Sequence, residues 1–428
     1  MSGVFKHFSF SRFKSLKNVE LVPGAFTLIV GANATGKSNI RDALRVLHGI
    51  GLGYTWAEIL GGRYGAGGVL QWRPIRGGAV ETATHGEEEF GLSTMLADQD
   101  ALSSYFVFVR CSDSLLGPHS RVEDAESHHH RLFTSHFGTK WPKQRNPHEL
   151  RVRVGKSKII DLPSQTPALT QLLHRRGVPE DVRAGCAEIA DALSSIRFLD
   201  LHPDAMREPS PPGVTILGDR GENLSSVLQA ISRDPARKEA LLGWVRALTP
   251  MDVTELVFKL DHRGKVMVYL VEADGVETSA ESASDGTLRF LALAAALHSP
   301  DTGKLFFFEE LDNGIHPTRM HLLLQLVRQA CKTQGVQVIA TTHNPALLAF
   351  LDAEDREHAV LTYRPEGSKY TKLRRIMSLP GVAEVLQTQD LGRLLTTGWL
   401  EDAAVFSDAD EPEPSPLAVD EALDEDAP

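Results

Sequence analysis

The sequence predicts an α/β fold with a mixed sheet, an inserted α+β lobe and a disordered acidic C-terminal tail. The first observation is a short apolar run at residues 26–30, followed by a glycine-rich loop and then by helical periodicity. The second is the alternation of helical and strand patterns between residues 287 and 364. The third is the segment 401–428, which contains eleven Asp and Glu residues and no Lys or Arg. Such a segment buries too little apolar surface to offset its chain entropy.

The composition excludes several classes of protein. The chain has 428 residues, of which 42% are hydrophobic, so it can bury a large core and hold two or three domains. Its net charge of -11 resides in the acidic tail, and the rest of the chain is neutral. No apolar run reaches the length of a membrane span, and the first residues lack the apolar core of a signal peptide. We therefore expect a cytoplasmic protein without membrane contact.

The three cysteines lie far apart and show neither the pattern of a disulfide framework nor that of a zinc site. Cys111, Cys186 and Cys331 are expected to be small buried side chains.

The glycine-rich loop fits the pattern G-x-x-x-x-G-K-[ST] at every fixed position. Its backbone N–H groups and the following helix N-terminus would surround a phosphate group. Lys37 would place its charge on the β and γ phosphates, and the Ser38 hydroxyl would bind Mg²⁺. Asn39 would either orient the metal shell or simply occupy the first helical turn. The predicted binding residues are Gly31, Ala32, Asn33, Ala34, Thr35, Gly36, Lys37, Ser38 and Asn39.

Two adjacent acids follow a second apolar run, residues 305–308. The carboxyl ends of strands in open α/β sheets are where ligands bind. We expect Glu309 to hold Mg²⁺, directly or through water, and Glu310 to orient or deprotonate the attacking water. The alternative is a solvated strand end, but the phosphate loop in the same predicted sheet favours a functional pair.

A third apolar run, residues 336–341, carries His343 to the same predicted edge. Its imidazole could hydrogen-bond a γ-phosphate or the attacking water. A structural histidine is the alternative.

Ser284, Asp285 and Gly286 precede a strongly apolar helical pattern. Ser284 is a natural N-cap, which is the structural explanation. The functional explanation is a second phosphate-binding surface made by its hydroxyl and the backbone N–H groups.

The segment between the first helix and the later α/β region is harder to interpret. Residues 49–78 are glycine-rich and lose periodicity. Strands are predicted at 105–110, 151–155 and 158–162, and a helix at 179–196. A helical stretch at 223–248, interrupted at Pro235, precedes two further predicted strands at 253–260 and 265–273.

These motifs in this order resemble the ABC-type P-loop ATPases of the SMC/RecF class, in particular the short-armed bacterial branch with OLD-like and phage-defence ATPases. The resemblance covers residues 5–48 and 195–395. It implies an ABC ATPase head formed by residues 1–50 and 195–400, an inserted lobe at 51–194, and ATP and Mg²⁺ as cofactors.

The resemblance further implies a head-to-tail homodimer, or a higher homo-oligomer, in which two subunits enclose two ATP molecules. Ser284 and Gly286 would then contact the γ-phosphate held by the other subunit, and Asp312 would face the same interface. Lys14 and Ser15 would lie on a strand near the nucleotide. One copy would bind ATP but would not complete the hydrolytic site.

The chain departs from the family pattern at three points. Glu309 replaces the more common Asp and is one methylene longer, which could shift its metal contact from direct to water-bridged. A glutamine that senses the γ-phosphate is expected, for which Gln71 is the candidate. Long coiled-coil arms are missing from the pattern.

Other patterns are weaker. The histidines at 128–130 and 136 suggest a metal site, but consecutive histidines do not face one point, so an exposed loop is favoured. The D-x-D at 408–410 resembles a Toprim nuclease motif, yet too little sequence follows it for that domain. Basic stretches at 151–158, 172–177 and 371–376 make DNA binding possible, although a solvated surface is favoured.

The predicted function is an ATPase whose dimer closes on ATP and transmits nucleotide state to an effector protein encoded nearby or to DNA, in bacterial phage defence. The alternatives are a nucleotide-gated scaffold that holds a toxin or nuclease with little hydrolysis, and a DNA-repair or recombination ATPase.

Overall fold

The computed structural model describes residues 4–98, 101–111, 117–128, 130–135, 148–249, 251–299 and 303–410. Its strands are β1 (Phe5–Phe13), β2 (Leu16–Leu21), β3 (Phe26–Val30), β4 (Arg63–Tyr64), β5 (Leu70–Trp72), β6 (Glu89–Asp98), β7 (Ala101–Arg110), β8 (His119–Ser127), β9 (His130–Thr134), β10 (Glu149–Val154), β11 (Lys158–Pro163), β12 (Ile196–Leu199), β13 (Val253–Leu260), β14 (Val266–Glu272), β15 (Glu277–Ser279), β16 (Leu305–Phe308), β17 (Gln337–Thr341), β18 (Val360–Tyr363) and β19 (Lys372–Arg375).

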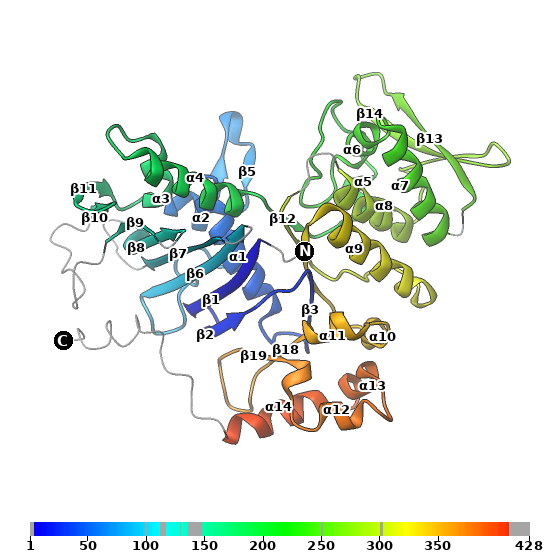
Figure 1. Cartoon of the computed structure of the whole chain (residues 1–428). Helices are drawn as coiled ribbons and strands as arrows, with labels where there is room; N and C mark the ends of the chain where they lie inside the picture. The colour runs from blue at the N-terminus through cyan, green and yellow to red at the C-terminus, as the bar shows by residue number, and fades with distance from the viewer. Residues whose placement is uncertain are drawn as a thin grey trace.

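Its α-helices are α1 (Lys37–Gly51), α2 (Trp56–Gly61), α3 (Ala168–His174), α4 (Glu180–Ser194), α5 (Pro203–Met206), α6 (Leu224–Ile231), α7 (Pro235–Leu248), α8 (Asp285–His298), α9 (Met320–Gln334), α10 (Pro345–Ala349), α11 (Ala353–Glu357), α12 (Val382–Val385), α13 (Leu391–Thr396) and α14 (Trp399–Asp410). Figure 1 shows their arrangement.

The central sheet confirms the predicted α/β fold. Among the described residues, six strands follow the order β12-β16-β17-β3-β18-β19. All neighbours are parallel except β18 and β19. Every residue of β3, β16, β17 and β18 is buried, which explains their nearly continuous apolar sequences.

Successive side chains of the central strands enter two different hydrophobic cores. Leu28, Phe306 and Val338 pack in the core that contains α8 and α9. Ile29 and Phe307 pack in the core that contains α1 and α4. The sheet is therefore covered by helices on both faces, and its carboxyl edge is the part left for a site.

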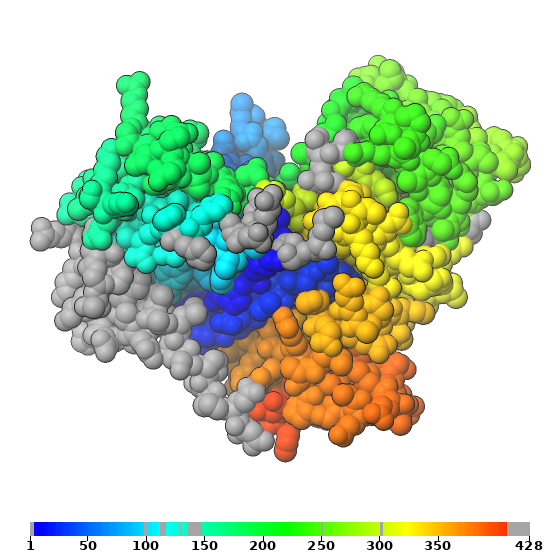
Figure 2. Space-filling view, in the orientation of Figure 1, coloured from blue at the N-terminus to red at the C-terminus, as the bar shows by residue number. Residues whose placement is uncertain are grey.

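A second, antiparallel sheet joins the N-terminal strands to the segment expected to form an inserted lobe. Its order among the described residues is β11-β10-β9-β8-β7-β6-β1-β2. β1 pairs with both β2 and β6. Figure 2 shows this N-terminal segment, in blue, between the cyan-to-green lobe and the yellow-to-orange region. The predicted domain boundary at residue 50 stays a prediction. The shared sheet shows that the N-terminal strands β1 and β2 form one layer with the strands of the expected lobe.

The third region combines the sheet β13-β14-β15 with α5, α6, α7 and α8. The two predicted strands at 253–260 and 265–273 are confirmed as β13 and β14. Pro235 begins α7 at its first turn, where its missing N–H carries no cost.

The glycine-rich segment 49–78 contains structure that its periodicity did not predict. α1 continues to Gly51, and α2 follows a capping box formed by Thr55 and Glu58. The short strands β4 and β5 then pair as a hairpin.

The C-terminal part of the chain corrects the expected start of the tail. Residues 399–410 form α14, in which Leu400 and Ala404 are fully buried. Asp408 accepts a hydrogen bond of 2.8 Å from the Tyr363 hydroxyl on β18 and one of 2.9 Å from Arg374 on β19. The tail prediction is therefore wrong for residues 401–410, and residues 411–428 lie outside the described residues.

None of the helices in the described ranges is both long and apolar enough to cross a membrane.

Candidate active site

The phosphate loop connects β3, in the middle of the central sheet, to α1. Gly36 has a φ of 109°, and a Cβ built there would lie 2.1 Å from Thr371 Oγ1. A Cβ on Gly31 would lie 2.1 Å from the Thr362 carbonyl oxygen. Both positions therefore require glycine because the loop lies directly against β18 and the start of β19.

Hydrogen bonds fix the loop in this position. The Thr35 hydroxyl donates to the Ala32 carbonyl at 2.9 Å and lies 2.8 Å from the Thr362 hydroxyl. Thr371 Oγ1 donates to the Thr35 carbonyl at 2.7 Å. These hydrogen bonds hold the loop in the cradle shape that a phosphate site needs.

Lys37, the first residue of α1, folds back over the loop. Its Nζ donates to the Gly31 carbonyl at 2.6 Å and to the Ala32 carbonyl at 2.8 Å. Burial lowers the pKa of this ammonium group, and the charge of Glu310 opposes the shift. These two carbonyls hold the cation at the mouth of the loop, where a phosphate group would compete for it.

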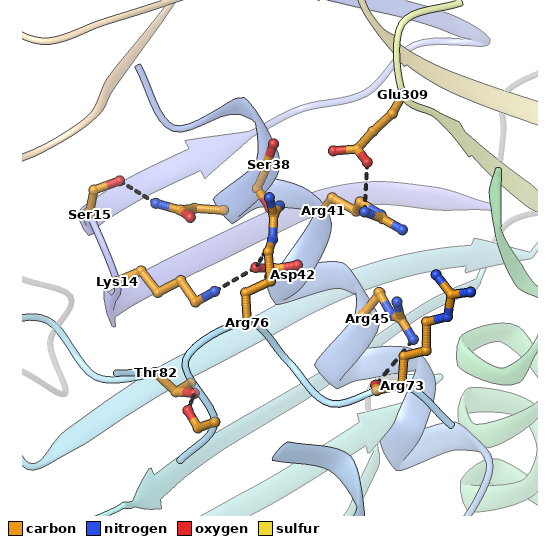
Figure 3. Close-up of polar contacts among 12 residues, drawn as sticks. Lys14, Ser15, Ser38, Arg41, Asp42, Arg45, Arg73, Arg76, Thr82 and Glu309 are labelled. Atoms are coloured by element: carbon orange, nitrogen blue, oxygen red, sulfur yellow. Dashed lines mark hydrogen bonds and ion pairs between the residues drawn. The ribbon is translucent and has the colours of Figure 1, made fainter. Parts of the chain in front are cut away.

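The paired acids lie at the carboxyl end of β16. Glu309 forms an ion pair of 2.6 Å with Arg41 of α1, as Figure 3 shows. Glu310 has a positive φ of 50°, which is uncommon for a residue with a side chain. Its backbone N–H donates to the Thr341 hydroxyl at 3.0 Å, so the neighbouring strand β17 stabilises this conformation.

The Glu310 carboxylate contacts two polar side chains. His343 Nε2 lies 3.1 Å from its Oε1, and Asn313 Nδ2 donates to its Oε2 at 3.0 Å. His343 follows β17, so the pair brings together the ends of two adjacent parallel strands. A carboxylate beside an imidazole is able to orient a water molecule and accept its proton.

These residues surround one cavity of about 520 Å³ at the carboxyl edge of the central sheet. Its lining residues are Asn33, Ala34, Gly36, Lys37, Ser38, Asn39, Arg76, Asp200, Glu309, Glu310, Thr341, His343 and Arg364. Ser38 and the acids at 200, 309 and 310 offer hard oxygen donors, which are the ligands that Mg²⁺ prefers. The cradle and this donor set together fit a phosphorylated ligand with its magnesium ion.

Residues of the phosphate loop and of α1 also contact the turn between β1 and β2. Thr35 is buried beneath the loop. Asn39 lines the cavity and also donates to Ser15 Oγ at 2.7 Å. Lys14 forms an ion pair with Asp42 of α1 at 2.5 Å, and Arg76 reaches the same carboxylate at 3.5 Å. The N-terminal hairpin thus lies against the phosphate-loop helix (Figure 3).

The three residues expected to act in trans are placed elsewhere. Within the described part of the chain, the lining of this cavity does not include Ser284, Gly286 or Asp312. Ser284 is exposed and caps α8 by accepting from Thr287 N at 3.2 Å. A Cβ on Gly286 would lie 2.4 Å from the Gly314 carbonyl oxygen. Asp312 is buried and accepts from the Thr342 hydroxyl at 2.7 Å.

Four residues that line this cavity were missed in the sequence, and one of them is Thr341, the last residue of β17. Asp200 follows β12, beside β16, and Arg364 follows β18, beside β3. Each ends an apolar run in the same way as Glu309, and that signal could have identified them. Arg76 lies beyond the β4–β5 hairpin, in the segment without periodicity, so no pattern pointed to it.

Two weaker predictions concern Gln71, the candidate glutamine sensor, and the histidines at 128–130 and 136. Gln71 lies on β5 and lines a second cavity, while the lining described above for the first cavity does not contain it. No cluster of three or more potential metal ligands occurs in the described ranges, in which His128 and His130 are exposed. His129 and His136 lie outside the described residues.

Residues 26–164 and 186–349 match the family described as "AAA domain, putative AbiEii toxin, Type IV TA system". No curated protein matches the chain.

Several solved structures are similar. An SMC head bound to the C-winged helix domain of ScpA has a TM-score of 0.50 and 14% identity, covering 87% of this chain and 97% of that chain. The SMC head domain from Thermotoga maritima has a TM-score of 0.44 and 12% identity, covering 87% and 99%. An Smc head domain from Pyrococcus furiosus, bound to the C-terminal domain of ScpA, has a TM-score of 0.46 and 13% identity, covering 90% and 98%.

Proposed function

This chain belongs to the family of AAA domains described as putative AbiEii toxin of a type IV toxin–antitoxin system, and from that premise we propose that it hydrolyses ATP as a sandwich dimer. The observation that carries the proposal is the cavity that gathers Lys37, Ser38, Glu309, Glu310 and His343 at one edge of the central sheet. A nucleotide-binding ATPase of the SMC-head fold uses this edge because parallel strands direct their carboxyl ends to it.

Each residue has a role that follows from its position. The loop from Gly31 to Gly36 would bind the phosphates through backbone N–H groups, and Lys37 would exchange its two carbonyl partners for phosphate oxygens. Ser38 and Glu309 would hold Mg²⁺, which when bound neutralises charge on the phosphate oxygens. Glu310 would orient the attacking water and accept its proton, with His343 fixing the carboxylate.

The ion pair of Glu309 with Arg41 has a consequence for this cycle. Arg41 holds Oε2 of Glu309, so a metal ion in the site would compete with Arg41 for this carboxylate. We infer that ATP binding and the release of this ion pair occur together.

A second subunit is proposed to complete the site. Ser284 is exposed at the N-terminus of α8, where the backbone N–H groups and the helix dipole favour an anion. Because Ser284 and Gly286 are absent from the lining of their own chain's cavity, we propose that they close the cavity of a partner copy. Asp312 would support the same interface.

The output of the cycle is proposed to reach another macromolecule. The SMC head with a TM-score of 0.50 carries a domain of ScpA, so a head of this fold is able to bind a partner protein. We propose an effector encoded nearby as the partner of this chain, with DNA as the other possible recipient, and bacterial phage defence as the setting. Copurification of an untagged neighbouring gene product would test the partner.

A nucleotide-gated scaffold with little hydrolysis is the second candidate. The observation that favours it is that both acids already have partners: Glu309 forms an ion pair with Arg41, and the Glu310 carboxylate lies 3.1 Å from His343 Nε2.

Steady-state ATP turnover separates the two candidates. In Glu310→Gln the water-orienting carboxylate is lost, so turnover should fall at least ~100-fold while ATP binding persists. Glu281→Gln, a change at an exposed acid, should leave turnover unchanged. Tight ATP binding with negligible turnover in the wild type would instead select the scaffold.

A further inference from the structure

A second cavity lies behind the phosphate-loop helix. Its volume is about 570 Å³, within the range of small-molecule sites. It is formed by the second half of α1, the β4–β5 hairpin, β12 and the segment 216–222. The candidate nucleotide site does not use it, because the two linings share no residue.

Arginine dominates the charge of this second cavity. Arg45, Arg73, Arg197 and Arg220 line it, together with the acids Asp219 and Glu222. The side chains therefore leave an excess of positive charge. A cavity with this balance favours an anion, and the planar guanidinium group suits phosphate in particular.

Arg45 is the central residue of the second cavity. It is only 6% exposed, and its guanidinium carbon lies 4.8 Å from the centre of the Trp72 ring. One Nη donates to the Arg73 carbonyl at 3.4 Å (Figure 3), while its Nε is buried without a hydrogen-bond partner. The Nε of Arg220 is also buried and unpaired. Unsatisfied buried donors are costly, so their presence at one cavity indicates a missing acceptor.

Apolar side chains provide the remaining surface. Leu52, Leu70 and Ile216 line the cavity and are each at least 40% exposed. An inorganic anion would leave these side chains in water, whereas an organic body would cover them.

We propose that this cavity is a second ligand site that binds an organic phosphate of nucleotide size, with its phosphate on Arg45 and Arg220 and its body on Leu52, Leu70 and Ile216.

Two connections join this second cavity to the candidate nucleotide site. Arg41, which holds Glu309, lies one helical turn before Arg45 on α1. Asp200, in the lining of the first cavity, donates its backbone N–H to the Asp219 carbonyl at 2.8 Å, and His202 does the same to Arg220 at 3.2 Å. A ligand that draws Arg45 and Arg220 together would therefore shift elements that carry both Arg41 and Asp200. This coupling rests on the proposed ATPase function, but binding at the second cavity does not.

Binding is tested by calorimetric titration of the full-length Lys37→Ala variant with AMP and with GMP, in the absence of magnesium. The substitution removes the cation of the phosphate loop, so the remaining binding reports the second cavity. We expect one of the two nucleotides to bind with one-to-one stoichiometry. Adding Arg220→Gln should weaken binding about tenfold or more, because a charge-assisted hydrogen bond is lost.

Matched variants keep this test specific. Ile216→Trp places a larger side chain in the lining of the second cavity without changing its charge, and it should abolish binding. Arg176→Gln removes an exposed arginine outside the second cavity and should leave binding unchanged. The Ile216 position is solvent-accessible, so this variant is expected to fold, which circular dichroism can verify.

Two results would overturn the site. One is the absence of AMP and GMP binding at concentrations up to about 5 mM. The other is binding that Arg220→Gln and Ile216→Trp leave unchanged. Equal binding of inorganic phosphate would show an anion site without a place for an organic body, and it would contradict the proposed ligand class.

The coupling has its own measurement. The bound nucleotide should change the ATP turnover of the wild-type chain and should have no effect on Ile216→Trp. Binding without any change in turnover would contradict the coupling. A chain without turnover would refute the ATPase proposal and leave the binding result in place.

Discussion

At the scale of single residues, the phosphate loop depends on two glycines whose Cβ positions are already filled by the neighbouring strand region. At Gly36 the obstacle is the Thr371 hydroxyl, which itself supports the loop by donating to the Thr35 carbonyl. The backbone there also has a positive φ of 109°. A side chain would have to displace the support of the loop or change its backbone.

We therefore predict that Gly36→Ala lowers ATP affinity at least ~10-fold, a loss of about 1.4 kcal/mol of binding free energy. Gly61→Ala is the matched control, since a Cβ there meets no atom within 4 Å. Equilibrium binding of a fluorescent ATP analogue measures both. Equal affinity in the two variants would show that the loop does not need glycine at residue 36.

Glu123 is a fully buried acid far from the candidate site in sequence. It accepts hydrogen bonds from the N–H groups of Ala168 and Leu169, at 2.7 and 2.8 Å, and so caps the start of α3. The Tyr105 hydroxyl donates to it at 2.8 Å. Burial raises the pKa of this carboxyl group to about 7, and these three hydrogen bonds, with a fourth from the Ser120 hydroxyl at 3.2 Å, oppose the shift.

This raised pKa predicts a pH dependence of stability. Because the folded chain holds the Glu123 proton more tightly than the unfolded chain, the free energy of unfolding should fall as the pH rises from about 4.5 to about 7. The loss is at most about 3.4 kcal/mol, at about 1.36 kcal/mol for each unit of the pKa difference. Glu123→Gln cannot titrate, so the difference between wild type and variant should shrink over this range.

Urea denaturation at several pH values checks this prediction. Glu126→Gln, on the same strand but more exposed, is the control and should follow the wild type. A difference between wild type and Glu123→Gln that stays constant over the range would contradict the raised pKa.

At the scale of elements, β18 and β19 connect the C-terminal helices to the phosphate loop. Thr362 of β18 and Thr371, beside β19, contact the loop on one side. Tyr363 and Arg374 bind Asp408 of α14 on the other. Lys372 adds a third contact to the same carboxylate at 3.0 Å. Asp408 thus fixes α14 on the strands that shape the loop.

Asp408→Ala should lower the free energy of unfolding by about 1–3 kcal/mol, because three donors lose their acceptor. Asp402→Ala, at an exposed position of the same helix, should change it by less than about 0.5 kcal/mol. Urea unfolding monitored by tryptophan fluorescence measures both values. A similar small effect of the two substitutions would show that α14 does not stabilise this region.

Sequence patterns predicted these elements unequally. The central strands were predictable because burial on both faces requires continuous apolar runs, as at 305–308 and 337–341. The hairpin β4–β5 was not, because two short strands separated by glycines carry no periodicity. α14 was hidden because it opens an acidic segment without Lys or Arg, and only the long-range contact of Asp408 and the burial of Leu400 reveal its packing.

The candidate site was likewise predictable only where local sequence patterns carry it. Glu309, Glu310 and His343 each follow an apolar run, so strand order alone brought them to the phosphate loop. Arg41 could not be recognised as the partner of Glu309, because that contact joins residues 268 positions apart. The pairing of β1 with β6 depends on a similar long-range contact and left no local signal.

At the scale of the whole molecule, the proposed function requires two copies. The cavity gathers the loop, the acids and His343 in one chain, whereas Ser284 lies exposed at the start of another element. The proposal therefore divides the hydrolytic site between a nucleotide-holding surface and a capping surface. An isolated chain would bind ATP and hydrolyse it slowly.

The most direct test is the molar mass of Glu310→Gln by light scattering, with and without Mg-ATP. This variant should keep ATP bound, so the account predicts a dimer with ATP and a single chain without it. Adding Ser284→Tyr should restore the single chain in the presence of ATP, whereas Ser378→Tyr, at an exposed serine elsewhere, should not. A single-chain mass at every ATP concentration, together with unchanged turnover of the Ser284→Tyr protein, would contradict the shared site.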